Sequence, residues 1–159
     1  MQHALRTFAL AIAFTIAIPQ SGEGTTMSQQ AKGSFDVKLQ PIDVYNKDDG
    51  SHLARMSIDK QFHGDLEATS KGEMISAMGG VKGSAGYVAI ERVTGTLSGR
   101  RGSFTLQHNA TMTRGEPYLN IIVVPDSGTG ELAGLSGTMK IIITNGAHAY
   151  EFDYALAGG

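Results

Sequence analysis

A glycine-rich segment of 11 residues occurs twice in this chain and restricts the folds that it can adopt. The first copy begins at Thr94 and reads TGTLSGRRGSF, and the second begins at Thr129 and reads TGELAGLSGTM. A looser copy, GDLEATSKGEM, begins at Gly64. Glycine-rich turns between segments of alternating apolar and polar residues are typical of β-hairpins, because glycine adopts positive φ and lets a strand bend sharply. We expect the glycines of both copies at turns or strand bends: Gly95, Gly99, Gly102, Gly130, Gly134 and Gly137.

The composition favours an all-β chain with a single domain. Glycine accounts for 21 of the 159 residues, roughly twice its usual share of about 7 %, and this length suits one domain with its own core. The net charge of −2 excludes a general attraction to nucleic acid, which depends on clustered basic residues. The absence of cysteine excludes disulfides, thiolate metal sites and a cysteine nucleophile.

Apolar and polar residues alternate with a period of two and predict eight strands. The strands lie around residues 34–40, 54–68, 72–79, 86–98, 102–113, 118–125, 137–145 and 148–156. Asp49-Gly50 marks the first connection, and Asn145-Gly146 marks the last as a two-residue hairpin turn. Eight strands with one apolar face each close most naturally into a single antiparallel meander β-barrel, whose interior holds side chains or one small ligand.

Two of the predicted strands are apolar on both faces. Residues 118–124 read YLNIIVV, and residues 141–143 are three isoleucines. These side chains cannot all face one barrel interior, because successive residues of a strand point to opposite sides. We therefore expect a second surface to cover their outer side, and we predict a homo-oligomer.

Residues 1–26 differ from the rest of the chain. Arg6 precedes an apolar run at residues 8–18, which is the layout of a secretory signal peptide and is too short to span a membrane. No Ala-x-Ala cleavage site follows this run, and Met27 offers an alternative start. The leader predicts a periplasmic or secreted protein, whereas a start at Met27 predicts a cytoplasmic one. In both cases we expect residues 27–159 to form the barrel without a membrane span, so that deletion of residues 1–26 leaves a folded, soluble protein.

The longer motifs resemble a known family. The runs GYVAIERVTGTLSGRRGSFTLQHNATM, VVPDSGTGELAGLSGTM and YEFDYAL look like an uncharacterised bacterial family, a domain of unknown function whose known structures are small barrels similar to allene oxide cyclase. The resemblance covers residues 33 to 156. It implies an allene oxide cyclase-like barrel, but it implies no activity, since function does not follow from fold.

His108 is the first candidate for chemistry. It shares a predicted strand face with Phe104, Leu106 and Met112, and this pattern predicts that it lies in the barrel interior. An imidazole in that position can act as a general base, or it can be a hydrogen-bonded core residue.

The phase of the strand around residues 86–98 decides the second candidate. Tyr87 and Val93 favour an inward face that carries Glu91, whereas Val88 favours an inward face that carries Arg92. We favour Glu91, because a carboxylate near His108 would form an acid–base pair with shifted pKa values. The alternative is a structural network that joins neighbouring strands.

Three hypotheses of function follow. The first is a barrel that binds a small apolar or aromatic molecule. Its expected ligand contacts, besides Glu91 and His108, are Tyr87, Phe104, Met112, Tyr150 and Tyr154. The second is an isomerase or cyclase in which Glu91 and His108 transfer a proton. The third is a structural module with a filled lumen and an oligomer interface. Because the sequence contains no recognisable cofactor or metal-binding motif, we predict neither a cofactor nor a metal ion.

Overall fold

The computed structural model describes residues 28–46 and 52–157. The described residues form nine β-strands, and no helix among them is long and apolar enough to cross a membrane. The strands are β1 (Gln29–Ile42), β2 (Leu53–Gly64), β3 (Leu66–Met78), β4 (Ala85–Leu97), β5 (Arg100–Thr113), β6 (Glu116–Val123), β7 (Thr129–Gly130), β8 (Leu135–Thr144) and β9 (Ala147–Leu156). The predicted leader and the Asp49-Gly50 connection lie outside the described residues.

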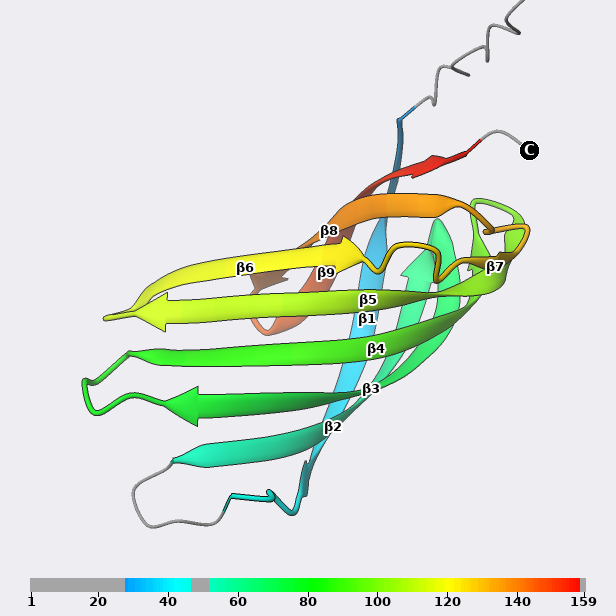
Figure 1. Ribbon diagram of the computed structural model, residues 1–159. Helices are drawn as coiled ribbons and strands as arrows, with labels where there is room; N and C mark the ends of the chain where they lie inside the picture. The colour runs from blue at the N-terminus through cyan, green and yellow to red at the C-terminus, as the bar shows by residue number, and fades with distance from the viewer. Residues whose placement is uncertain (1–27, 47–51, 158–159) are drawn as a thin grey trace, which may run out of the picture.

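Eight of these strands close into a barrel. Their order is β4-β3-β2-β1-β9-β8-β6-β5, and β5 pairs back with β4, so that the ring is complete. Every pairing is antiparallel. Figure 1 shows β2 to β5 side by side as a curved wall, with β1 crossing behind them. The predicted eight-stranded meander is confirmed, and β7 is an added two-residue strand that pairs with β5.

One predicted strand, residues 54–68, is wrong because a tight turn divides it. β2 ends at Gly64, which has a φ of +105°, and β3 begins at Leu66. The predicted strand at residues 72–79 is therefore the second half of β3. Phe62 pairs with Ala68 across the turn, so the inward positions of both strands are even-numbered. Apolar and polar residues alternate with the same phase on both sides of the turn, so the sequence pattern does not reveal where β2 ends.

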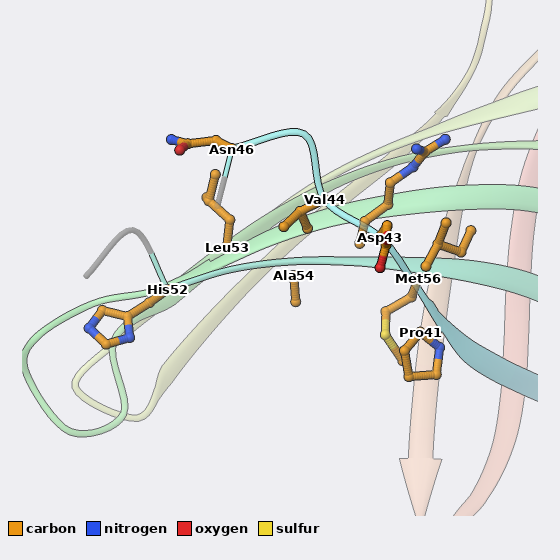
Figure 2. A pocket seen from close by; sticks show the side chains of 10 residues that line it. Pro41, Asp43, Val44, Asn46, His52, Leu53, Ala54 and Met56 are labelled. Atoms are coloured by element: carbon orange, nitrogen blue, oxygen red, sulfur yellow. The ribbon is translucent and has the colours of Figure 1, made fainter. Parts of the chain in front are cut away.

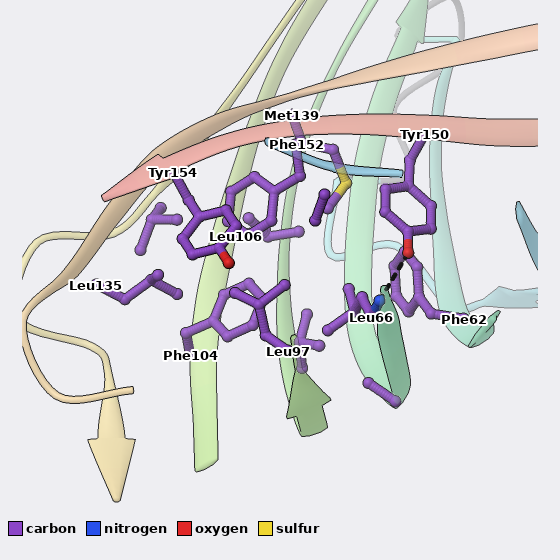
Figure 3. Close-up of a cluster of buried hydrophobic side chains, with 14 of the residues drawn as sticks. Phe62, Leu66, Leu97, Phe104, Leu106, Leu135, Met139, Tyr150, Phe152 and Tyr154 are labelled. Carbon is purple, nitrogen blue, oxygen red and sulfur yellow. Dashed lines mark hydrogen bonds between the residues drawn. The ribbon is translucent and has the colours of Figure 1, made fainter. Parts of the chain in front are cut away.

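Aromatic side chains fill the end of the barrel that holds the β2–β3 and β4–β5 turns (Figure 3). The ring of Phe152 stacks on Phe104 at 5.7 Å and on Tyr154 at 5.4 Å between centroids. The hydroxyl of Tyr150 accepts a hydrogen bond from the Leu66 N–H at 2.9 Å, drawn as the dashed line in Figure 3. The predicted inward faces of residues 102–113 and 148–156 are thus confirmed, and this end of the lumen is a packed core.

The two repeat copies build turns that close the filled end. Ser98 and Gly99, with φ of +47° and +84°, join β4 to β5, and Gly134, with a φ of +75°, precedes β8. The leucine at the fourth position of each copy, Leu97 or Leu132, is fully buried. The expected turn glycines with positive φ are Gly99, Gly130 and Gly134, whereas Gly95, Gly102 and Gly137 lie in strands close to neighbouring backbone. Each copy therefore combines a glycine turn with a leucine that plugs the barrel.

The predicted Asn145-Gly146 turn is confirmed, with φ of +52° and +81°, and it joins β8 to β9 at the opposite, open end. The register between β6 and β8 among the described residues consists of the pair Ile122 with Thr138, which lies away from the open end. Both strands were predicted to be apolar on both faces, and Ile142 on β8 is 44 % exposed. Nothing in the single chain tests the homo-oligomer, which stays a prediction.

Candidate functional site

Four polar side chains meet inside the barrel above the filled end. Adjacent strands supply them: Lys60 from β2, Ser70 from β3, Glu91 from β4 and His108 from β5. All four are buried, and Glu91 is 0 % exposed. Burial of charged groups costs free energy unless they are paired and hydrogen-bonded. This polar cluster is therefore the least expected part of an otherwise apolar lumen.

Glu91 is the centre of the polar cluster. Its Oε1 atom accepts hydrogen bonds from Lys60 Nζ at 2.6 Å and from His108 Nε2 at 2.8 Å. Its Oε2 atom accepts a hydrogen bond from Ser70 Oγ at 2.6 Å. The ammonium of Lys60 also lies 5.0 Å from the ring centroid of Phe35, within the range of a cation–π contact. The carboxylate thus binds three donors from three different strands.

The space for the Glu91 side chain comes from a glycine on the next strand. Gly72 of β3 pairs directly with Glu91 of β4. A Cβ atom at position 72 would lie 2.6 Å from both Cα and Cβ of Glu91, closer than real Cβ contacts. Glycine in the middle of a strand often marks such a close approach. Gly72 is therefore part of what lets a charged side chain enter the lumen.

The cluster keeps Glu91 ionised. Burial alone would raise the pKa of Glu91. The hydrogen bond from His108 and the positive charge of Lys60 outweigh burial and lower the pKa to about 2. Because an ionised carboxylate only accepts hydrogen bonds, Nε2 of His108 carries its hydrogen. Nδ1 makes no hydrogen bond within the described residues. Burial and the negative charge of Glu91 raise the pKa of the nearby Tyr87, so its hydroxyl stays protonated at neutral pH.

A cavity of about 190 Å³ lies against the polar cluster, toward the open end of the barrel. All eight barrel strands line it. The lining residues are Phe35, Val37, Leu39, Ile58, Lys60, Met74, Tyr87, His108, Leu119, Ile141, Ile143 and His148. Its walls are mostly apolar, and Lys60 and His108 bring the polar cluster to its surface. We call this space the site cavity.

The structure brings together three of the residues proposed from the sequence. Glu91 and His108 are hydrogen-bonded, the inward phase of Glu91 is the observed one, and Tyr87 lines the site cavity. Met112 lies outside this cavity, in a groove on the ends of β3 to β6. Phe104, Tyr150 and Tyr154 lie in the packed core and do not line the site cavity. Their position differs because the lumen is filled at one end, which the alternation of a single strand does not reveal.

Sequence reasoning missed Lys60 and Ser70. Lys60 occupies the same strand face as Ile58 and Phe62, so the pattern contained a charged residue at an inward position. Ser70 follows Leu66 in the same way along β3. A charged residue such as Lys60 on the same strand face as buried apolar residues is therefore the sequence signal that predicts a partner for Glu91.

A larger depression of the described surface does not contain the polar cluster. It has a volume of about 480 Å³ and lies at the connection from β1 to β2, next to residues outside the described part of the chain. Figure 2 shows Pro41, Val44 and Met56 among the side chains around it. Half of its lining residues are exposed, and none of them is buried. We place the candidate site at the smaller cavity because that cavity reaches buried ionisable groups.

Among the described residues, no group of three or more His, Asp or Glu side chains could hold a metal ion. His63 is exposed on the outer surface, apart from His108 and His148 at the site cavity. That the protein binds no metal ion and no cofactor stays a prediction.

Residues 31–154 match the model of a family described as a protein of unknown function, DUF3224. The chain belongs to this family. A crystal structure of a DUF3224 protein of unknown function from Shewanella oneidensis MR-1 is 54 % identical to the chain, with a TM-score of 0.80. The match covers 84 % of this chain and 100 % of that one. No curated protein matches the chain. The predicted membership of an uncharacterised bacterial family is thus confirmed, and DUF3224 membership indicates no specific function.

Proposed function

We propose that this DUF3224 protein binds a small, mostly apolar molecule in the site cavity. The observation that carries the proposal is the buried polar cluster at the base of an apolar cavity. A barrel that needed only stability would be filled throughout, as it is around Phe104 and Phe152. Instead, the lumen holds a buried ion pair, which is often no more stabilising than apolar side chains of similar volume. An apolar cavity with a few convergent polar groups is the usual form of a ligand site.

The site cavity has room for a small molecule and continues into the groove on the ends of β3 to β6. The groove has a volume of about 270 Å³ and shares Met74, Tyr87 and Leu119 with the cavity. Ligand sites usually measure about 300 to 1,000 Å³. Cavity and groove together reach this range, whereas the cavity alone does not.

Native mass spectrometry of the protein purified from its own source tests the proposal. We expect a bound small molecule whose mass disappears in a Leu119→Trp variant, because the indole would fill the site cavity. Val88→Trp is the matched control, since Val88 is exposed on the outer face of β4. A folded wild-type protein without adduct, and without chemical-shift changes at His108 when a library of apolar fragments is added, would contradict ligand binding.

A second candidate function is an isomerase or cyclase, and the geometry of His108 favours it. Glu91 orients the ring through Nε2 at 2.8 Å, and the ring borders the site cavity with Nδ1 unbonded within the described residues. A histidine oriented by a carboxylate is a common general base. In this role His108 Nδ1 would take a proton from a carbon atom next to a carbonyl group of the substrate, and the Lys60 ammonium would stabilise the resulting enolate oxygen. His108 would then return the proton to a carbon atom of the enolate.

Deuterium exchange into 2-octanone in D₂O tests the enzymatic role. We expect the protein to accelerate the exchange of protons next to the carbonyl group, and His108→Gln to abolish the acceleration. The glutamine keeps a donor toward Glu91 but cannot act as a base. Exchange at the uncatalysed rate, under conditions in which NMR shows that the ketone is bound, would eliminate this candidate and leave the binding function intact.

A further inference from the structure

Hydrogen-bond donors dominate the polar groups at the site cavity. The Lys60 ammonium has three N–H groups, and Glu91 Oε1 accepts one of them. Tyr87 contributes a hydroxyl that remains protonated at neutral pH. The buried carboxylate of Glu91 is already occupied, because Oε1 accepts two hydrogen bonds and Oε2 accepts one. A ligand that complements these groups therefore brings acceptor atoms.

The charges of the cluster set a further condition on the ligand. With a neutral His108, the negative charge of Glu91 and the positive charge of Lys60 cancel. A bound anion would then be an unpaired buried charge, which is strongly unfavourable. His108 can supply the missing positive charge by taking up a proton at Nδ1, which makes both ring nitrogens donors. An anion and one proton would thus enter the cluster together.

The shape of the cavity limits the rest of the molecule. Met74, Tyr87 and Leu119 line both the site cavity and the groove, so that one apolar surface leads from the polar cluster to the barrel rim. At the rim this surface continues to Met78 and Met112. Methionine side chains adapt to different apolar shapes. The lining therefore fits an elongated apolar body whose polar end lies deepest.

We propose that the ligand is an organic acid with an elongated apolar body, that its carboxylate lies against Lys60 and His108, and that its binding is coupled to the uptake of one proton by His108. This inference rests on the proposed binding function and specifies the class of ligand. No covalent step is involved, since the acid and the proton bind and leave unchanged.

The surroundings of His108 define which groups take part in the protonation. Glu91 and Tyr87 of β4 and Lys60 of β2 face His108. Ser70 of β3 donates its hydrogen bond to Glu91. The neighbouring positions on β6, Leu119 and Ile121, are apolar, and His148 of β9 lines the same cavity. His148 is the other imidazole at this cavity, so the experiment includes a variant of each histidine.

Titration calorimetry with three matched probes tests the inference: octanoate, 1-octanol and octylamine. Their chains are alike, and their heads are an anion, a neutral hydroxyl and a cation. At pH 8 we expect octanoate to bind about tenfold more tightly than 1-octanol, the effect of one charge-assisted hydrogen bond. Octylamine should bind most weakly. Measurements in phosphate and in Tris should show uptake of about one proton per octanoate and none per 1-octanol.

Variants assign the effect to residues. His108→Gln should abolish proton uptake, and His148→Gln should keep it. Because Lys60→Met alone leaves a buried carboxylate with one donor fewer and can fail to fold, Lys60→Met is combined with Glu91→Gln. This double variant should lose about tenfold in octanoate affinity and keep its 1-octanol affinity. Lys32→Met with Glu151→Gln is the matched control, since that exposed ion pair on the outer surface has the same chemistry.

The outcomes separate the two levels of the proposal. If none of the three probes binds the folded protein, the proposed binding function fails and the ligand class fails with it. If 1-octanol or octylamine binds as tightly as octanoate, or if octanoate binds without proton uptake, the acid is the wrong class while the binding function stands. An octanoate affinity that survives in the folded double variant overturns the role of Lys60, and proton uptake that survives in His108→Gln overturns the role of His108.

Discussion

The two ends of this barrel are built from the same strands but differ in what fills them. At the filled end, Phe152 stacks on both Phe104 and Tyr154, and the repeat leucines close the lumen. Toward the open end the same inward positions carry Lys60, Glu91 and other groups around the site cavity. The filled end is expected to supply the stability of the fold, and the open half is expected to tolerate change. The difference indicates that apolar packing is concentrated in one half of the lumen, and the proposed binding function uses the other half.

The largest expected effect is a loss of core packing at the filled end. Phe152→Ala should lower the free energy of unfolding by about 3 to 5 kcal/mol, because it removes a fully buried ring and leaves a cavity. Leu39→Ala, at a half-exposed residue of the site cavity, should cost less than about 1 kcal/mol. Urea denaturation measures both values. Equal costs would show that the two halves do not differ in this way.

The second effect concerns acid stability. The pKa of Glu91 is about 2 in the folded protein against an ordinary value of 4.5, so the unfolded chain binds a proton at a higher pH than the folded chain does. This difference contributes about 3 kcal/mol of stability above pH 4.5, and the contribution is lost as the pH falls from 4.5 toward 2. Urea denaturation across this range should show a fall in stability that is absent in Glu91→Gln. The exposed Glu151→Gln variant should keep the fall, and a wild-type curve as flat as that of Glu91→Gln would refute the ionised cluster.

A smaller effect is expected at the repeat turns. Gly99→Ala and Gly134→Ala should each cost more than about 1 kcal/mol, because both positions have positive φ. At Gly134 an added Cβ would also lie 3.0 Å from the Ala157 Cβ. Gly80→Ala, in the β3–β4 turn at the open end, should be close to neutral, since it lacks a positive φ and has open space around it. Thermal unfolding compares the three variants, and neutral changes at both repeat glycines would remove the role of the repeat in closing the barrel.

The last prediction concerns the assembly of the protein, and no change in the free energy of unfolding is expected. We propose that the outer side of the doubly apolar strands β6 and β8 is covered in a homodimer or larger oligomer. Analytical ultracentrifugation at about 100 μM should detect it, because this concentration fills any interface of micromolar affinity. Ile142→Glu should shift the protein toward monomer, whereas Thr69→Glu on the exposed outer face of β3 should not. A wild-type monomer at this concentration would refute the assembly.

Local alternation was enough to determine most of the fold. It identified the inward faces of β5 and β9, the Asn145-Gly146 turn and the number of barrel strands, because each of these depends on neighbouring residues of one segment. It did not reveal the turn at Gly64, since Phe62 and Ala68 keep the same parity on both sides of that turn. When the two-residue alternation continues through a turn, the sequence pattern does not show where one strand ends and the next begins.

The sequence by itself thus determined an eight-stranded all-β barrel and membership of an uncharacterised bacterial family, and it favoured Glu91 beside His108 without excluding Arg92 at the inward position. Only the tertiary structure decided which half of the lumen is hollow and that Lys60 and Ser70 complete the cluster. The physical reason is that filling depends on side chains that eight strands bring to one level of the barrel, so that no single strand contains the information. The position of Glu91 was ambiguous for the same reason, because the donors that stabilise a buried carboxylate come from three other strands.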